Sequence, residues 1–498
     1  MLWRASMFAL LLPGSIPVAA FCKSGSTHPV AISGDIKDGG IRGTFRRTVE
    51  PRKGRYVEAV ELGDLKRGAG FDGRLAWSRD VSGASHFLTS DFAKRLARSE
   101  AWLRTHVACP PPRNAAHQHV NSATGFDVWQ VTPPMGAPIE LWYDRRTNRL
   151  DRAVLHYSEN DLIRHFSDWR PVGSGRMFPF KERDEDPEDE SETVYTVHNV
   201  SAATAEAFGP PTLANDSKIL RGSSTTIAYE DDDRRRIFLP VYLDGKGPFT
   251  FELDNGAHFI LTEATAQVLG LNPRGSFSST GAGNEVHKTG YVTIGDLRVG
   301  DAQITNQPAK VLPLTHNERP NGMPPRAGIL GLELFERFIV AIDHRDKKVT
   351  LYKMGDPAVP HRGHPVRLLF DEDAALAAGS YEGIAGNVML DIGNAGATII
   401  EDFWAAAHGL RANLSQGEQR GSQWFSKGTV GIGPFKLDNE TVSYFGPAER
   451  GSEYTRSVAA VAGEPLLSRF DAVYDYGHET VWLDPLQNVG QHSFEKGP

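Results

Sequence analysis

Two short segments of the chain each end an apolar run with an acidic residue on a glycine turn. Residues 249–256 read Phe-Thr-Phe-Glu-Leu-Asp-Asn-Gly and residues 388–393 read Val-Met-Leu-Asp-Ile-Gly, which gives Asp254 and Asp391 equivalent positions. Glycine permits a sharp turn after a strand, so each segment can present a carboxylate to a cleft. If the two carboxylates meet, they share one proton: the ionised member can activate water and the protonated member can polarise a carbonyl group. This chemistry requires no metal, no nucleophilic Ser or Cys and no organic cofactor.

The elements that would position these acids are also repeated. Residues 262–271 and residues 401–410 each predict a short helix that ends in Gly-Leu, as expected of a glycine cap. Further along, each half has a glycine followed by a phenylalanine and then by an aspartate: Gly331, Phe338 and Asp343, and Gly463, Phe470 and Asp475. The two intervals are seven and five residues in both halves. Features that match in order and spacing predict an internal duplication. The repeated aspartates, Asp343 and Asp475, are interpreted as turn caps rather than as a second catalytic pair.

The block from about Arg235 to Pro485 resembles the retropepsin-type aspartyl protease family, in its bacterial single-chain, two-lobed form. The resemblance rests on an Asp-x-Gly turn and a hydrophobic-hydrophobic-Gly element in each lobe and on a Gly-rich flap in lobe 1. These are Asp254-Asn255-Gly256, Ile329-Leu330-Gly331 and Gly281-Ala282-Gly283 in lobe 1, and Asp391-Ile392-Gly393 and Val461-Ala462-Gly463 in lobe 2. Residues 419–424 are the candidate for the flap of lobe 2. The resemblance implies an aspartic endopeptidase with Asp254 and Asp391 as catalytic residues and no cofactor. It also implies that substrate contacts Gly256, Gly281, Ala282, Gly283 and Gly393.

The chain departs from the family at the residue after each acid. The family has Thr or Ser there, and the hydroxyl holds the two acidic loops in register; this chain has Asn255 and Ile392. An Asn side chain can still donate and accept hydrogen bonds, whereas an Ile side chain cannot. The alternative to an active peptidase is therefore a catalytically inactive, peptide-binding protein of the same fold.

The region before these lobes predicts a different domain. Alternating strand patterns at residues 55–62, 74–79, 125–131 and 139–144 surround one helix, which begins after Ser90 and ends near His106. The turn at residues 70–73 followed by Ala76-Trp77, with the turn at residues 144–147, resembles the half-barrel of bacterial lipoprotein-carrier-like domains. The resemblance implies either a domain that orients the protease or a carrier or scaffold that binds an apolar ligand.

We therefore expect a mainly β protein with two retropepsin-like β-barrel lobes from an internal duplication, preceded by an antiparallel β half-barrel domain with one or two helices. The predicted segments are a signal peptide at residues 1–20, the half-barrel at 27–208, a linker at 209–225, lobe 1 at 226–356 and lobe 2 at 357–488. Because one chain carries both lobes, it can act as a monomer.

The N-terminus predicts export to the periplasm or the medium. Arg4 precedes an apolar run, and residues 18–20 read Val-Ala-Ala, which fits the small-residue cleavage rule. A lipid anchor on Cys22 is not expected, because Phe21 stands where a small residue would precede a lipidated cysteine. Cys22 and Cys109 are the two cysteines, and they either pair in the oxidising compartment or remain free thiols. No later segment is apolar enough to span a membrane.

Composition gives no sign of nucleic-acid binding, whereas a peptide or protein substrate is what the resemblance to aspartyl proteases implies. The net charge is -8, and the acidic run at residues 182–192 nearly accounts for it, so the remainder has no basic footprint. We interpret this run as an exposed hairpin tip. His361 and His364 lie three positions apart, a spacing that could ligate a metal from one face of a helix. Gly363 lies between them and Pro365 follows them, which excludes a helix, so no metal site is expected.

Overall fold

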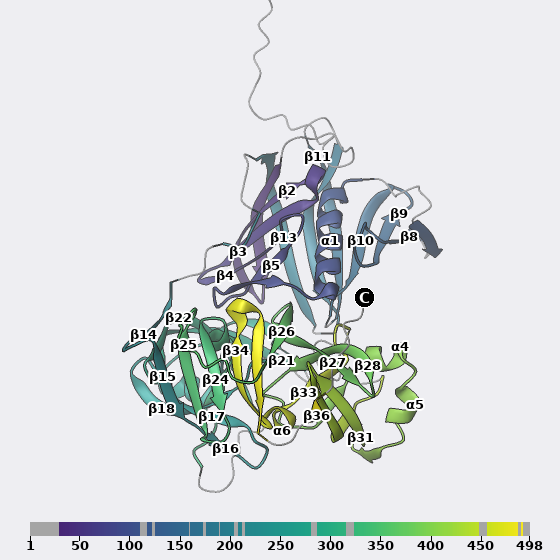
Figure 1. Ribbon diagram of the computed structural model, residues 1–498. Coiled ribbons are helices and arrows are strands. Elements are labelled where there is room, and N and C mark those ends of the chain that lie inside the picture. Colours follow the sequence, from purple (N-terminus) through teal and green to yellow (C-terminus); the bar gives the residue numbers. More distant parts are fainter. Residues whose placement is uncertain are drawn as a thin grey trace, which may run out of the picture.

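The computed structural model describes residues 29–109, 117–121, 125–158, 160–172, 176–188, 190–203, 208–211, 215–279, 286–314, 323–447, 456–486 and 490–491. The chain is mainly β and is built on three sheets. The first sheet and one long helix form the upper part of the molecule in Figure 1, and the other two sheets form the lower part. The predicted signal peptide lies outside the described residues.

The first sheet has thirteen strands, all paired antiparallel, in the order β6-β5-β4-β3-β2-β1-β13-β12-β11-β10-β9-β8-β7. Its strands are β1 Val30–Asp38, β2 Ile41–Glu50, β3 Arg55–Leu62, β4 Leu65–Phe71, β5 Ala76–Arg79, β6 Ser85–Leu88, β7 His117–Asn121, β8 Phe126–Val131, β9 Ile139–Asp144, β10 Arg149–His156, β11 Asp161–Val172, β12 Arg176–Asp186 and β13 Ser191–Ala202, with one 3-10 turn, η2 Pro51–Lys53, between β2 and β3. This curved sheet is the predicted half-barrel.

The helix α1, Asp91–His106, lies across the sheet (Figure 1). It begins as predicted, because the Ser90 hydroxyl accepts a hydrogen bond from the backbone N–H of Ala93 at 2.9 Å. Apolar residues of the helix, including Leu96 and Leu103, pack with the sheet in one hydrophobic core. The prediction of several antiparallel strands around one helix is confirmed.

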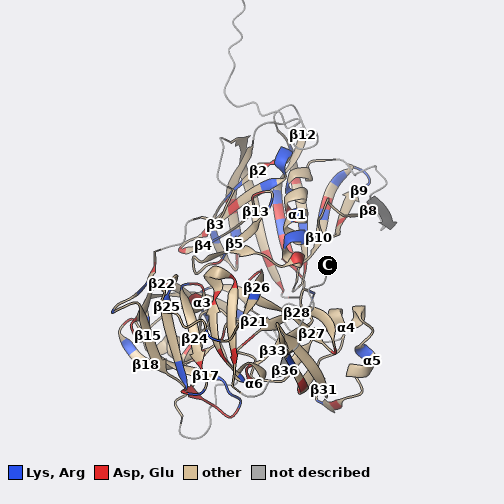
Figure 2. Cartoon of the chain, viewed as in Figure 1, with Lys and Arg blue, Asp and Glu red and all other residues tan. Residues whose placement is uncertain are grey.

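Residues of both charge signs lie on α1 and on the strands around it (Figure 2). Several of them form buried ion pairs: Arg47–Glu58, Arg47–Glu182, Arg104–Glu58, Arg104–Glu100, Arg164–Glu100 and Arg164–Asp184. The expectation that residues 182–192 form an exposed tip is thus wrong in part. Glu188, Glu190 and Glu192 are exposed, but Glu182 and Asp184 are paired with arginines because strand β12 carries them into the interior.

The second sheet closes into a barrel, since β21 and β22 pair in addition to the order β14-β22-β19-β23-β18-β17-β21-β20. Its strands and helices are β14 Ser217–Ile219, β16 Glu230–Asp231, β17 Ile237–Leu243, β18 Lys246–Leu253, β19 Ile260–Thr262, α2 Glu263–Leu269, β20 Arg274–Ser279, β21 His287–Val299, β22 Ala302–Leu312, β23 Gly328–Leu330 and α3 Leu332–Phe335. Helix α2 ends at Gly270, which has a φ of 77°, as the Gly-Leu signal predicts.

The third sheet contains the remaining strands and also closes, through an additional pairing of β27 with β31. Its elements are β15 Ser224–Ala228, β24 Phe338–Asp343, β25 Lys348–Lys353, β26 His364–Asp371, β27 Ala374–Tyr381, β28 Ile384–Leu390, β29 Thr398–Ile400, α4 Asp402–Ala407, α5 Arg411–Leu414, β30 Glu418–Arg420, β31 Gln423–Ile432, β32 Phe435–Tyr444, β33 Ala460–Ala462, α6 Glu464–Leu467, β34 Phe470–Asp475, η3 Tyr476–His478, β35 Thr480–Pro485 and β36 Gly490–Gln491. Strand β14 lies within the expected linker, residues 209–225, and strand β15 begins at its end. Part of the expected linker is therefore strand.

The two lobes repeat the same strand pairings. In the first lobe β18 and β23 run parallel, as do β19 and β22, while β19 and β23 run antiparallel. In the second lobe the same three relations hold for β28 with β33, β29 with β32, and β29 with β33. Strand β24 of the first half then pairs with β34 of the second, which joins the lobes through one shared sheet. The repeated connectivity supports the proposal of an internal duplication.

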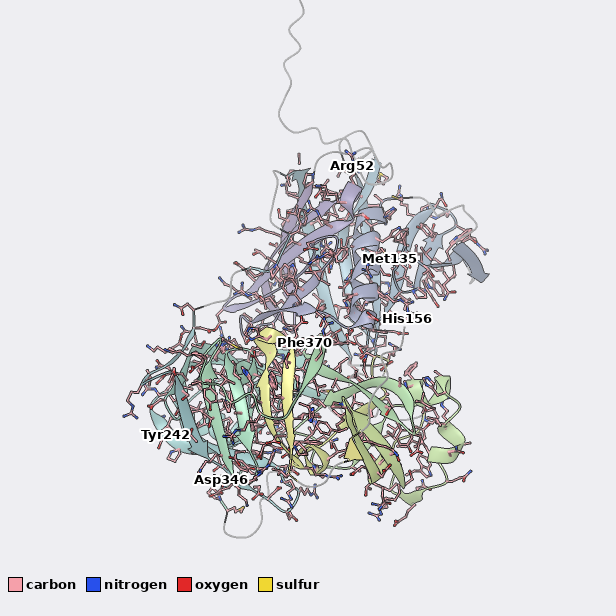
Figure 3. The ribbon with its side chains drawn as sticks, in the orientation of Figure 1. Arg52, Met135, His156, Tyr242, Asp346 and Phe370 are labelled. Atoms are coloured by element: carbon pink, nitrogen blue, oxygen red, sulfur yellow. The ribbon has the colours of Figure 1, made fainter. Side chains whose placement is uncertain are left out.

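The half-barrel docks onto the lobes at the start of its helix. The backbone N–H groups of Thr89 and Ser90 donate to the carbonyl oxygen of Phe370 at 2.8 and 2.9 Å, and the Thr89 hydroxyl accepts from the N–H of Phe370. Figure 3 labels Phe370 at this junction. Among the described residues, none of the helices has the length and apolar character needed to cross a bilayer.

Candidate active site

Asp254 and Asp391 directly follow equivalent strands, β18 and β28, and each loop is held by the hydrophobic-hydrophobic-Gly element of its own lobe. The N–H of Asp254 donates to the carbonyl oxygen of Leu330 at 3.2 Å, and the N–H of Asp391 donates to that of Ala462 at 3.0 Å. Gly331 lies so close to the first loop that a Cβ there would be 2.0 Å from the Asp254 carbonyl oxygen. The glycine is therefore required by the close backbone approach.

The two loops bring the carboxyl groups together. The side chains of Asp254 and Asp391 share a hydrogen bond, and both remain partly exposed. Each also accepts a hydrogen bond from the glycine two residues later, at 2.8 Å from Gly256 and 2.9 Å from Gly393. A Cβ on Gly393 would be 2.0 Å from the Asp254 carboxyl carbon, and one on Gly256 would be 2.9 Å from Asp391 Oδ1. The glycines thus leave room for the two acids to meet.

Burial raises the pKa of both carboxyl groups. The pKa of Asp391 rises to about 6, and two backbone N–H groups, from Gly393 and Asn394, limit the rise because they stabilise the ionised form. The pKa of Asp254 rises well above its usual value, first through burial and then through the charge of Asp391. Glu252 adds to both shifts; it is buried and paired with Arg326. Such a pair retains a proton at a pH where ordinary carboxylates have lost theirs.

Asn255 connects the two loops. Its Oδ1 accepts from the backbone N–H of Ile392 at 2.9 Å, and its Nδ2 donates to the carbonyl oxygen of Leu390 at 2.7 Å. The Asn255 side chain is almost fully buried. Ile392 takes part through its backbone alone, and its side chain is buried in the shared core of the lobes.

Tyr476 is a residue of the site that the sequence analysis did not identify. Its hydroxyl accepts a hydrogen bond from Asn255 Nδ2 at 3.1 Å, and its ring lies 5.0 Å from that of Phe370 and 5.5 Å from that of Phe335. Burial raises the pKa of this tyrosine, so its hydroxyl stays protonated. The only sequence signal is its place directly after Asp475, which does not indicate a contact across the lobes.

The flap residues Gly281, Ala282 and Gly283 lie outside the described residues. The strands β20 and β21 that lead to them pair with each other and lean against the half-barrel. The N–H of Ser276 donates to the Gly39 carbonyl oxygen at 2.7 Å, and Phe277 packs on the half-barrel core. In the second lobe the expected hairpin is present, because β30 and β31 pair from Arg420 and Gln423 outwards.

Residues that were interpreted as structural have structural contacts. Asp343 and Asp475 each cap a turn by accepting a backbone N–H, from Asp346 and His478 respectively. His361 and His364 lie against Trp482 and Phe435. In the described part of the chain, one group of histidine and acidic side chains has the spacing of metal ligands, Asp80, His258 and Asp373. It lies beside the acidic loop of lobe 1 rather than in the carboxyl pair.

Comparison with known proteins gives the following. Residues 239–334 match the family model described as aspartyl protease. Among solved structures, a retropepsin-like aspartic protease from Rickettsia conorii is 20% identical, with 26% of this chain and 90% of that chain covered and a TM-score of 0.19. A domain named for outer membrane lipoprotein sorting, from Vibrio parahaemolyticus, is 8% identical, with 37% of this chain and 88% of that chain covered and a TM-score of 0.25. A DUF1329 family protein from Desulfovibrio piger is 14% identical, with 38% of this chain and 92% of that chain covered and a TM-score of 0.26.

No curated protein matches the chain. The matched family segment runs from β17 to α3 and contains Asp254, Asn255 and Gly331. Over residues 239–334 the chain is therefore similar in sequence to the aspartyl proteases.

Proposed function

We propose that this protein is an exported aspartic endopeptidase that hydrolyses peptide bonds with water activated by Asp254 and Asp391. The observation that carries the proposal is the close approach of two carboxyl groups from equivalent loops of two lobes. A Cβ on Gly256 would lie 2.9 Å from Asp391 Oδ1 and 3.3 Å from Asp254 Oδ1. A buried pair that shares one proton supplies a base and an acid within reach of one water molecule and one carbonyl group.

The surroundings of the pair favour one assignment of the shared proton. Asp391 accepts two backbone N–H donors, whereas Asp254 accepts one. Because these donors stabilise an ionised carboxylate, Asp391 is the base that takes a proton from water, and Asp254 is the acid that polarises the scissile carbonyl group. The attack gives a tetrahedral intermediate, and proton transfer to the amine nitrogen releases the two products.

Export is proposed from the N-terminal signal and from the redox state of one cysteine. Cys109 is disulfide-bonded, and disulfides persist in oxidising compartments such as the periplasm. The chain has one other cysteine, Cys22, which lies outside the described residues. The compartment is consistent with a peptidase that meets peptides or proteins outside the cytosol.

The half-barrel has the character of a positioning domain rather than a carrier. Its cavity, of about 550 Å³, is lined by eight acidic residues and four arginines as well as by apolar side chains. Arg104 and Arg164 lie in this lining and belong to the buried ion-pair network. An apolar ligand would have to displace or cover these charges at a large desolvation cost. The carrier alternative is therefore disfavoured by the chemistry of the interior.

Incubation of the purified chain with a diverse peptide library, analysed by mass spectrometry, tests the proposal. We expect discrete internal cleavages that a statine-type inhibitor blocks and that both Asp254→Asn and Asp391→Asn abolish. The matched control is Asp343→Asn, which neutralises an acid in a turn outside the site and leaves an oxygen that can still accept the turn's hydrogen bond. If no peptide is cut but peptides bind and compete with the inhibitor, the protein is the inactive, peptide-binding alternative. If cleavage persists in both Asn variants, the carboxyl pair is not the catalyst.

A further inference from the structure

Three acidic or histidine side chains from separate segments meet where the half-barrel joins both lobes. Asp80 lies in the turn between β5 and β6, and Asp373 lies in the turn between β26 and β27. His258 lies in lobe 1, four residues after Asp254. One potential ligand atom from each of the three residues lies within 4.8 Å of the others. Phe370, which Figure 3 labels, precedes Asp373 by three residues.

Both ring nitrogens of His258 face carboxylates. Nε2 lies 2.9 Å from Asp373 Oδ2, and Nδ1 lies 3.2 Å from an oxygen of Glu333 and 4.0 Å from Asp80 Oδ2. A histidine that binds a metal through one nitrogen characteristically donates its other N–H to a carboxylate. His258 is placed for this pattern whichever nitrogen serves as the ligand.

Two carboxylate oxygens of the cluster have no hydrogen-bond partner. They are Oδ2 of Asp80 and Oε2 of Glu333. The Glu333 side chain is 2% exposed, and its other oxygen points at His258. A buried carboxylate oxygen without a donor is unfavourable unless a cation or a proton compensates it.

The charges around the cluster leave a negative excess. Glu336 and His86 are the next titratable groups, with His86 Nε2 at 3.5 Å from Asp373. Lys310 also acts on Asp373, and Arg337 pairs with Asp216 and lies 3.8 Å from Glu336. Arg337 is left out of the count because it pairs with Asp216. The acids of this region are then Asp80, Glu333, Glu336 and Asp373. They face the imidazoles of His86 and His258 and the ammonium group of Lys310. With all four acids ionised and both imidazoles charged, these groups sum to one negative charge.

We propose that Asp80, His258 and Asp373 bind a first-row divalent cation such as Zn²⁺ or Mn²⁺, with Glu333 beside His258 as the acid that orients its ring. One imidazole nitrogen and carboxylate oxygens are the donor set that these ions accept. The cation would offset the charge of these acids and satisfy the unpartnered Oδ2 of Asp80. It would also tie the half-barrel, lobe 1 and lobe 2 together beside the catalytic loop. The inference stands apart from the proposed peptidase activity, because it concerns binding alone.

The site is accessible to a hydrated ion. The side chains of Asp80, His258 and Asp373 are 11%, 21% and 28% exposed. Asp80 and Asp373 also line the half-barrel cavity, in which acids outnumber arginines by eight to four. A cavity with excess negative charge concentrates cations at its walls.

Isothermal titration of the chelator-treated, full-length chain with Zn²⁺, and separately with Mn²⁺, tests the proposal. We expect one equivalent to bind, and we expect Asp80→Asn and Asp373→Asn each to weaken binding at least about 100-fold, because each removes a charged ligand. The matched control is Asp64→Asn, which changes another acid between the half-barrel and lobe 1, paired with Arg274. It should bind as the unmodified chain does. The added cation should also raise the melting temperature of the unmodified chain and of the control, but not of the two ligand variants.

The proposal is overturned if the unmodified chain takes up no stoichiometric equivalent of either ion, or if both ligand variants bind as tightly as it does. Circular dichroism first establishes that each variant is folded. Where a variant does not fold, His258→Gln replaces it, and stoichiometric uptake by the unmodified chain remains the deciding measurement. Since the readouts are binding and melting temperature, loss of peptidase activity neither supports nor contradicts this site.

Discussion

Asn255 Oδ1 accepts a hydrogen bond from the backbone N–H of Ile392 at 2.9 Å, across the interface between the two lobes. The same amide donates through Nδ2 to the Leu390 carbonyl oxygen. One side chain therefore satisfies a donor and an acceptor on the opposite loop. The contact does not depend on the side chain of residue 392, so a hydrocarbon is tolerated there. The Asn255 amide therefore links the two loops without a polar side chain at residue 392.

Replacing Asn255 by Leu should separate the two acidic loops. Leu has a similar volume but cannot donate or accept, so the N–H of Ile392 and the carbonyl of Leu390 lose their partners in a buried place. We expect the free energy of unfolding to fall by about 2–4 kcal/mol and kcat to fall at least about 100-fold, because small displacements of a catalytic pair have large effects on rate. Urea denaturation and peptide hydrolysis measure the two effects.

Ile392→Val is the control for this variant. It keeps the backbone N–H that Asn255 holds and removes one buried methylene group. We expect a stability loss of about 1 kcal/mol and a kcat within a few-fold of the unmodified value. Equal activity in Asn255→Leu and Ile392→Val would show that the amide does not hold the pair.

The pH dependence of stability should report the carboxyl pair. The ordinary pKa of an aspartate is 3.8, and in the folded protein the pKa of Asp391 is raised to about 6 and that of Asp254 higher still. The folded state therefore binds more protons than the unfolded state between these values. The stability that the protonated pair contributes is fully present below pH 3.8 and is lost as the pH rises through the folded pKa values.

Asp254→Asn should remove this contribution. Its free energy of unfolding, relative to that of the unmodified chain, should increase from pH 4 to pH 8, because the variant no longer places a second charge beside Asp391. Asp343→Asn, which lies outside the carboxyl pair, is the matched control. Denaturation series at several pH values make the comparison. A constant difference for Asp254→Asn would contradict the shared-proton arrangement.

The acidic turns and the matched offsets could be predicted from the sequence because they depend on local rules. Glycine turns, helix caps and strand patterns are each encoded within about ten residues, and their repetition in order fixes which segments correspond. The contacts of Asn255 and Tyr476 could not be predicted in this way. They join residues more than 130 positions apart, as in the bond from Asn255 to Leu390, and a single sequence holds no measure of such distances.

The acidic run at residues 182–192 of the half-barrel is a second case in which contacts between distant residues could not be predicted from the sequence. A block of like charges is usually solvated, and the tip of the β12–β13 hairpin follows that rule. Glu182 and Asp184 do not, because their partners Arg47 and Arg164 come from strands β2 and β11. The alternation of side chains along β12 turns these two acids inwards, but only the pairing of distant strands supplies the cations.

Arg164→Met tests the weight of that buried network. The Arg164 side chain is 5% exposed and pairs with Glu100 and Asp184, whose charges would remain buried without it. We expect the free energy of unfolding to fall by about 3–5 kcal/mol. Arg170→Met, on the same strand, removes an arginine that is 56% exposed and pairs with Asp168, and it should cost less than about 1 kcal/mol. Equal losses in urea denaturation would contradict a structural role for the interior charges.

Phe277→Ala should loosen the flap of lobe 1 from the half-barrel. The ring of Phe277 lies 5.1 Å from that of Tyr291 and packs over Gly39, where added bulk would clash with it. Because the ring is only partly buried, we expect its removal to lower the local opening free energy by about 1–2 kcal/mol, which corresponds to roughly tenfold faster amide exchange in β20. Hydrogen–deuterium exchange measures this, with the β30–β31 hairpin of lobe 2 as an internal reference that should not change. Tyr242→Ala, which removes an exposed ring from lobe 1, is the matched variant. Equal exchange in β20 for both variants would mean that the half-barrel does not hold the flap.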